Sequence, residues 1–201
     1  MTTLLLARHA SHDVVGSVLC GRMPGVHLGA AGRAEAAALA RHVAAARPAA
    51  LFASPQPRAR ETAAVIGAAC GIEPAEEAAL DEIDFGAWTG RAFAELDRDP
   101  HWRVWNADRA TARPPGGEAM FEVQARILAW VETLPRRHPG VTVAAVSHAD
   151  VIKAALMAHL GLSPDAHGRF EVAPASLSAI VLWPGGGRVR SINETPAPAQ
   201  E

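Results

Sequence analysis

Short apolar runs alternate along this chain with longer segments of helical periodicity, and this alternation restricts the fold more than any other feature. The apolar runs typical of buried strands are TLLLA at 3–7, AALFAS at 49–54 and VTVAAVS at 141–147. Helices are expected at 32–47, 58–70 and 150–159. Because adjacent parallel strands need a long crossover connection, usually a helix, the pattern predicts an α/β domain with a mostly parallel sheet.

The remaining segments do not follow this alternation of strands and helices. Two strand-like runs at 177–183 and 187–193 flank a glycine-rich turn, so we expect a hairpin that makes the sheet mixed. Residues 83–116 hold three of the five tryptophans and a stretch rich in Pro and Gly. We interpret them as a cap-like insertion that packs over the sheet edge and precedes a long helix at about 118–137.

Length and charge exclude several classes of protein. A chain of 201 residues fits one domain, which we expect over 1–195, with 196–201 as a disordered tail. The net charge of -2 provides no electrostatic footprint for nucleic acid or an anionic membrane, and no signal peptide or membrane span is indicated. Cys20 and Cys70 form neither a disulfide framework nor a C-x-x-C motif, so we expect a cytoplasmic protein.

Polar side chains that are costly to bury follow three of the predicted strands. Arg8 and His9 end the first, Ser54 and then Arg58 follow the second, and His148 follows the third. Because ligands of such sheets bind outside the carboxyl ends of the strands, we expect these groups to converge. Arginine forks suit phosphoryl oxygens, and histidine can attack phosphorus. The sequence therefore predicts a site for phosphoryl chemistry.

Five segments carry a resemblance to a known family. LLLARHA, SPQPRARETA, LDEIDFGAWTG, PPGGE and VSHA resemble, in this order, the signature stretches of the histidine phosphatase superfamily, also called the phosphoglycerate mutase-like family. The resemblance extends from residue 4 to about 160, and GRMPGVHLGAAGR resembles the corresponding segment of several small bacterial members. It implies a three-layer α/β/α sandwich with a mostly parallel central sheet.

The resemblance also implies roles for single residues. His9 matches the nucleophile that becomes a phosphohistidine, and Arg8, Arg58 and His148 match the groups that bind the phosphoryl oxygens. Glu82 matches the proton donor that protonates the leaving oxygen and then activates water. The family pattern implies neither a cofactor nor a catalytic metal.

Neighbouring residues offer alternatives to two of these assignments. Arg60 lies close to Arg58, but its spacing from the preceding strand does not match the motif. Asp81 and Asp84 compete with Glu82, which the motif selects. The other histidines are expected to be structural or exposed, and their spacing does not favour a metal site; they are His12, His27, His42, His101, His138, His159 and His167.

Three positions depart from the commoner family pattern. Ala10 stands where many members have Gly, His12 where Ser or Thr is common, and Val15 where Asn often helps to hold substrate. We expect these changes to affect the choice of substrate and not the phosphoryl chemistry.

The combined prediction is a metal-independent phosphomonoester phosphatase that acts through a phosphohistidine on a small phosphorylated metabolite. Two alternatives stay open: phosphoryl transfer of the phosphoglycerate mutase type, and a non-catalytic module that binds a phosphorylated ligand. A mutase usually has a longer insertion with additional basic residues, which favours the phosphatase for this short chain. A homodimer is a further expectation, through exposed strand or tryptophan surface.

Overall fold

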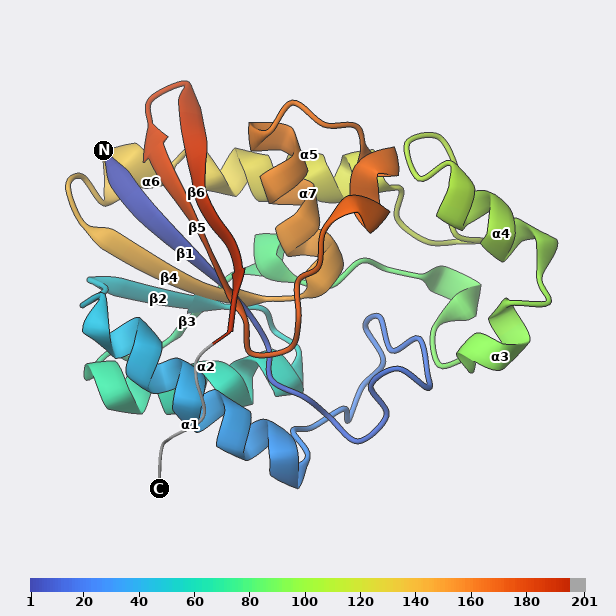
Figure 1. Ribbon diagram of the computed structural model, residues 1–201, viewed down its shortest axis with the longest axis horizontal. Coiled ribbons are helices and arrows are strands. Elements are labelled where there is room, and N and C mark those ends of the chain that lie inside the picture. The colour runs from blue at the N-terminus through green and yellow to red at the C-terminus, as the bar shows by residue number, and fades with distance from the viewer. Residues whose placement is uncertain (196–201) are drawn as a thin grey trace.

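The computed structural model describes residues 1–195 and contains a six-stranded sheet in the order β3-β2-β4-β1-β5-β6 (Figure 1). The strands are β1 (Thr2–Arg8), β2 (Ala50–Ala53), β3 (Ala75–Glu76), β4 (Thr142–Ser147), β5 (Leu177–Trp183) and β6 (Gly186–Glu194). The tail expected at 196–201 lies outside the described residues.

The sheet is mixed and mostly parallel, as the sequence predicts. β1, β2, β3 and β4 are parallel to one another, whereas β5 runs antiparallel to β1 and forms the predicted hairpin with β6. The register pairs Arg8 with Ser147 and Ala53 with Val146. The residues that follow these strands therefore emerge at one edge of the sheet.

Helices cover both faces of the sheet and give three layers (Figure 1). On one face, Leu5 and Ala7 of β1 pack in a core with α1 (Ala30–Ala45) and α2 (Pro57–Cys70). On the other face, Leu4 and Leu6 pack with α5 (Met120–Val131) and α7 (Ala149–His159). Because successive side chains of a strand point to opposite faces, one apolar strand supplies both cores. The α/β class and its layers are thus confirmed.

Two predicted helices have different bounds in the structure. The first begins at Ala30, two residues before the predicted start. Gly32 lies inside this helix, where the absence of a side chain lets the helix approach the backbone of Ser11. A Cβ atom at Gly32 would lie 1.8 Å from the backbone oxygen of Ser11. The helix expected at 118–137 is divided into α5 and α6 (Leu134–Arg137), since Pro135 lacks an N–H for a continuing helix.

The segment expected as a cap lies beyond the carboxyl ends of the central strands (Figure 1). Its helices are short: η2 (Gly86–Trp88), α3 (Phe93–Leu96) and α4 (Pro100–Ala107). Trp88 packs edge-on against Trp102 and Trp105, with ring centroids 5.3 and 6.4 Å apart. The tryptophans therefore hold this segment together, as the sequence indicates. The remaining short helices are η1 (Ala78–Leu80) and η3 (Pro164–Arg169).

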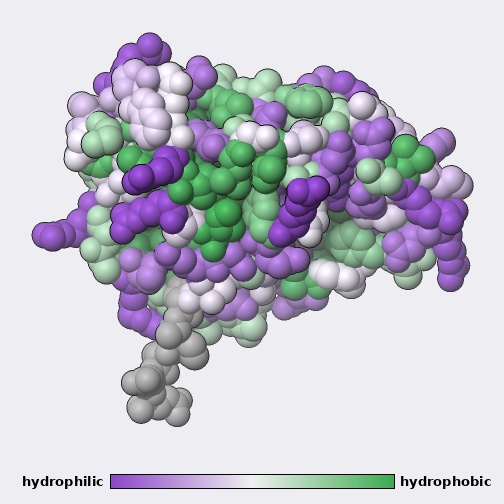
Figure 2. Space-filling view, turned by 45° about the horizontal axis from the view of Figure 1, so that its top comes forward, coloured by the Kyte–Doolittle hydropathy of each residue, from purple (hydrophilic) through white to green (hydrophobic). Residues whose placement is uncertain are grey.

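Within residues 1–195, no helix combines the length and the apolar composition needed to cross a bilayer. On the face drawn in Figure 2, hydrophobic residues gather near the middle with hydrophilic residues around them. The homodimer expected from the sequence stays a prediction.

Candidate active site

His9 follows β1 directly, and one of its two ring nitrogens carries an available lone pair. Its side chain is buried, and Nδ1 lies 2.8 Å from the carbonyl oxygen of Ala10. A carbonyl only accepts, so Nδ1 carries the hydrogen and Nε2 is unprotonated in the neutral ring. Arg58 Nε donates to His9 Nε2 at 3.3 Å. Burial, and then the charges of Arg58 and Arg8, hold the pKa of His9 well below its usual range, which keeps the ring neutral.

Two arginines line the same cavity as this imidazole, and each keeps a donor free. Arg8 Nη1 donates to the carbonyl oxygen of Val172 at 2.8 Å, and Arg58 Nη2 donates to that of Gly21 at 2.8 Å. Arg8 Nε and Arg58 Nη1 are buried and have no hydrogen-bond partner within residues 1–195. Buried donors without partners are costly, so both atoms are suited to an anionic ligand. Arg60 is exposed, as expected.

His148 joins the same group of side chains from the end of β4. Its ring centroid is 5.0 Å from that of His9, and it is fully buried. Arg58 Nη2 lies 3.2 Å from His148 Nδ1; since arginine only donates, Nε2 carries the hydrogen and donates to Ser54 Oγ at 2.7 Å. His148 Nδ1 is also 3.6 Å from Glu82 Oε2. His148 thus contacts Arg58 and Glu82, and its side chain does not form part of the cavity wall described below.

Glu82 is a buried carboxyl group on the loop that follows η1. Its Oε1 accepts a hydrogen bond from the backbone N–H of Ile83 at 3.0 Å. Burial, with the negative charge of Asp150, raises the pKa of Glu82 to about 7, against the opposing charge of Arg58. A carboxyl group with this pKa can donate a proton and later accept one near neutral pH. Asp81 and Asp84, the alternatives from sequence, do not line the cavity.

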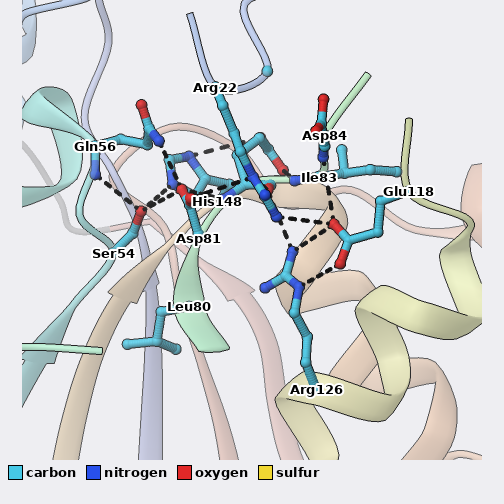
Figure 3. Close-up of polar contacts among 12 residues, drawn as sticks. Arg22, Ser54, Gln56, Leu80, Asp81, Ile83, Asp84, Glu118, Arg126 and His148 are labelled. Atoms are coloured by element: carbon cyan, nitrogen blue, oxygen red, sulfur yellow. Dashed lines mark hydrogen bonds and ion pairs between the residues drawn. The ribbon is translucent and has the colours of Figure 1, made fainter. Parts of the chain in front are cut away.

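The backbone of Glu82 is held by a network of charged side chains, of which Figure 3 labels Arg22, Asp81, Glu118 and Arg126. Arg22 Nε donates to the Glu82 carbonyl oxygen at 2.7 Å, and Arg126 Nη2 donates to the same oxygen at 3.3 Å. Glu118 pairs with both arginines, at 3.1 Å from Arg22 Nη2 and 2.8 Å from Arg126 Nε. On the other side, Asp81 Oδ1 accepts from the Glu82 N–H at 2.8 Å. Arg22, in the loop after β1, and Arg126, in α5, therefore fix the position of the loop that bears Glu82.

A cavity of about 140 Å³ opens between the two arginines and the cap. Arg8, His9, Arg58 and Glu82 line it together with Cys20, His12 and Asp150. The rest of its side-chain wall is apolar and comes from Val15, Val18, Leu19, Phe85, Phe93 and Ala149. Within residues 1–195, no group of three or more His, Cys, Asp or Glu side chains is arranged to hold a metal ion.

Two further polar residues line this cavity: His12, which the sequence analysis lists among the histidines expected to be structural or exposed, and Asp150, which it does not select. His12 is buried, its ring lies 5.6 Å from that of His9, and burial with the charges of Arg58 and Arg8 lowers its pKa to about 4. Asp150 lies in the first turn of α7, where Oδ1 accepts from Arg109 at 3.0 Å and from His167 at 2.6 Å. Asp150 follows the same strand end as His148, and that position is the signal that could have identified it.

Comparison with known proteins places this geometry in a family. Residues 4–195 match the histidine phosphatase superfamily (branch 1). The chain is 30% identical over 185 residues to phosphoserine phosphatase 1 of Hydrogenobacter thermophilus, covering 90% of this chain and 86% of that protein. It is 35% identical over 150 residues to a bifunctional protein of Mycobacterium tuberculosis, covering 73% of this chain but only 41% of the relative's length.

A solved structure agrees with these matches. The native structure of a mycobacterial glucosyl-3-phosphoglycerate phosphatase superposes with a TM-score of 0.86 at 27% identity, covering 96% of this chain and 98% of that one. The family match extends over nearly the whole described chain, and the resemblance found in the five sequence motifs is confirmed. The chain belongs to branch 1 of the histidine phosphatase superfamily, the phosphoglycerate mutase-like family.

Proposed function

We propose that this protein hydrolyses small phosphomonoesters without a metal ion, through a phosphohistidine formed on His9. The observation that carries the proposal is the unprotonated Nε2 of a neutral His9, which faces the Arg58 guanidinium in a cavity also lined by Glu82. A neutral imidazole is the nucleophilic form, and fixed cations stabilise the charge on the equatorial phosphoryl oxygens.

In the first step, His9 Nε2 attacks phosphorus and the bond from phosphorus to the leaving oxygen breaks. Arg8 and Arg58 bind the phosphoryl oxygens through their free donors. Glu82 transfers its proton to the leaving oxygen, which departs as an alcohol and leaves Glu82 ionised. We assign His148 to the phosphoryl site, although its side chain does not line the cavity and its Nδ1 accepts a hydrogen bond from Arg58 Nη2. After the ring exchanges tautomers, Nδ1–H can donate to a phosphoryl oxygen in place of this contact, while Nε2 accepts from the Ser54 hydroxyl, which can reverse its role.

In the second step, a water molecule attacks the phosphorus of the phosphohistidine from the side that the alcohol has left. The Glu82 carboxylate takes a proton from this water, the bond between phosphorus and Nε2 breaks, and inorganic phosphate is released. Glu82 is protonated again and His9 returns to its neutral form, so the cycle closes. A pKa of about 7 suits Glu82 to both roles.

The charge of the cavity wall favours a phosphatase over a mutase. Among its lining residues, within the described chain, only Arg8 and Arg58 carry a permanent positive charge. A mutase has to hold a second phosphate position, for which this wall offers no further cation. Two of the relatives named above are phosphatases for phosphoserine and glucosyl-3-phosphoglycerate, which makes both compounds reasonable members of a substrate panel.

The test is phosphate release from p-nitrophenyl phosphate and a panel of alkyl phosphates, with a chelator present throughout. We expect turnover by the native protein and none by His9→Ala. The control is His42→Ala, which removes a surface histidine and should keep native turnover. Rapid quenching should trap an acid-labile phosphoryl group on the native chain but not on His9→Ala.

Three other outcomes of this test would each contradict the proposed function. Turnover that stops on addition of chelator contradicts the metal-independent mechanism. Isotope exchange between phosphoglycerates without phosphate release indicates a mutase. Saturable binding of phosphomonoesters without a trapped phosphohistidine indicates the non-catalytic module.

A further inference from the structure

The positive charge in the cavity is matched to a single phosphoryl group. Arg8 and Arg58 line the cavity together with His9, and a phosphomonoester is close to a dianion at neutral pH. The cations nearest to the wall are already paired. Arg109 is bound to Asp150, and Arg22 lies 3.2 Å from Asp81 and 3.1 Å from Glu118. Among residues 1–195, no arginine or lysine other than Arg8 and Arg58 lines the cavity.

Asp150 brings an ionised carboxylate to this wall, whereas its partner Arg109 does not line the cavity. Its Oδ1 is occupied by Arg109 and His167, whereas Oδ2 has no hydrogen bond to any described residue. Although burial acts to raise its pKa, the hydrogen bond from His167 and the charge of Arg109 hold the pKa of Asp150 well below its usual range. The side chain is thus an ionised acceptor at the cavity, suited to a hydroxyl or ammonium donor.

Within residues 1–195, the remaining wall offers no further cation that would compensate a second anion. Val18, Leu19, Phe85 and Phe93 present carbon atoms, and His12 is held neutral by its lowered pKa of about 4. A carboxylate placed here would lose water without gaining a cation, and it would be repelled by Asp150. Hydroxyl and ammonium substituents also lose water here, but they can donate to Asp150 Oδ2.

We propose that the cavity selects phosphomonoesters whose leaving group is neutral or cationic, and that Asp150 discriminates against a second anionic group. This inference rests on the proposed phosphatase function and deepens it, since it names the chemical class of the leaving group. It also predicts that the substrate preference of this chain differs from that of phosphatases acting on carboxylate-bearing phosphomonoesters.

The test compares glycerol 3-phosphate with 3-phosphoglycerate, which differ only by a hydroxymethyl group in place of a carboxylate. Each is measured as a competitive inhibitor of p-nitrophenyl phosphate hydrolysis, so a result is obtained whether or not it is turned over. We expect glycerol 3-phosphate to bind roughly tenfold more tightly or better. Equal inhibition, preference for 3-phosphoglycerate or no inhibition by either compound overturns the inference, while hydrolysis of p-nitrophenyl phosphate upholds the proposed function independently.

The variant Asp150→Asn tests whether Asp150 causes the preference for glycerol 3-phosphate over 3-phosphoglycerate. The amide keeps an oxygen acceptor for Arg109 and His167 but removes the charge, so the ratio of the two inhibition constants should narrow by about threefold or more. Asp97→Asn, at an exposed position in the cap, is the matched control and should keep the native ratio. An unchanged ratio in a folded Asp150→Asn protein refutes the role of Asp150. If that variant does not fold, the native comparison still decides the inference.

Discussion

At the scale of single residues, Glu82 carries the sharpest prediction about chemistry. Glu82→Gln cannot donate a proton, and an alkoxide leaves poorly without one, whereas p-nitrophenolate leaves readily. We therefore expect kcat/KM to fall by about 100-fold or more for an alkyl phosphate and by much less for p-nitrophenyl phosphate. Steady-state kinetics on both substrates measure this difference.

The pH dependence of the native protein follows from the same group. Donation requires the protonated carboxyl, so kcat/KM for an alkyl phosphate should decline as the pH rises through about 7. Glu76→Gln, an exposed substitution on β3, should keep the native profile. Equal slowing of both substrates in Glu82→Gln, or a native profile that is flat between pH 6 and 8, would show that another group is the acid.

At the scale of elements, the loop bearing Glu82 depends on an ion-pair network that reaches it from α5. Glu118 orients Arg22 and Arg126, and both donate to the carbonyl oxygen of Glu82. Glu118→Gln weakens these pairs and lets the carboxyl group move, so turnover of alkyl phosphates should fall roughly tenfold. The KM for p-nitrophenyl phosphate should change little, because the arginines at His9 are untouched.

The matched control for this network is Glu122→Gln. Glu122 pairs with Arg113 on the surface, where both side chains are about half exposed. Exposed pairs contribute little, so this variant should keep both kinetic constants. A fall in turnover that is the same for alkyl and aryl phosphates in Glu118→Gln would indicate general destabilisation and refute a positioning role.

The elements could be predicted where local pattern decides the structure. β1 and β4 are apolar runs bounded by polar residues, and that signal is sufficient. The two-residue β3 has no periodicity to detect, and the division between α5 and α6 depends on Pro135 within a sequence that is otherwise helical. The start of the first helix was predicted two residues late. The glycine at position 32 allows a close contact with Ser11 inside the helix, and only the tertiary structure reveals this contact.

The candidate site could be predicted to the extent that its residues lie in motifs or at strand ends. Arg8, His9, Arg58, Glu82 and His148 come together in the structure, although their roles stay predictions. His12 was expected to be structural or exposed, because the path of the loop after β1 brings it to the cavity and no spacing encodes that path. Asp150 was not selected, although its position two residues after His148 was an available signal.

At the scale of the whole molecule, the burial of Glu82 in the candidate site lowers the free energy of unfolding as the pH rises. In the unfolded chain Glu82 titrates near 4.5, and in the folded protein its pKa is about 7. Between these values the folded state binds one more proton than the unfolded state, so stability falls as the pH rises. Above pH 7 the loss reaches about 3 kcal/mol, since each pH unit of difference is worth about 1.4 kcal/mol.

Glu82→Gln should therefore stabilise the protein increasingly from pH 5 to pH 8, because the amide has no charge to bury. Chemical denaturation at several pH values measures the difference in free energy of unfolding between variant and native protein. The buried His9 and His148 act in the opposite direction below about pH 6.5, but they are present in both proteins and their effect cancels in the difference. Glu76→Gln should give a difference that does not vary with pH. If Glu82→Gln behaves like that control, Glu82 is not held protonated by the fold, and its assignment as the proton donor loses its physical basis.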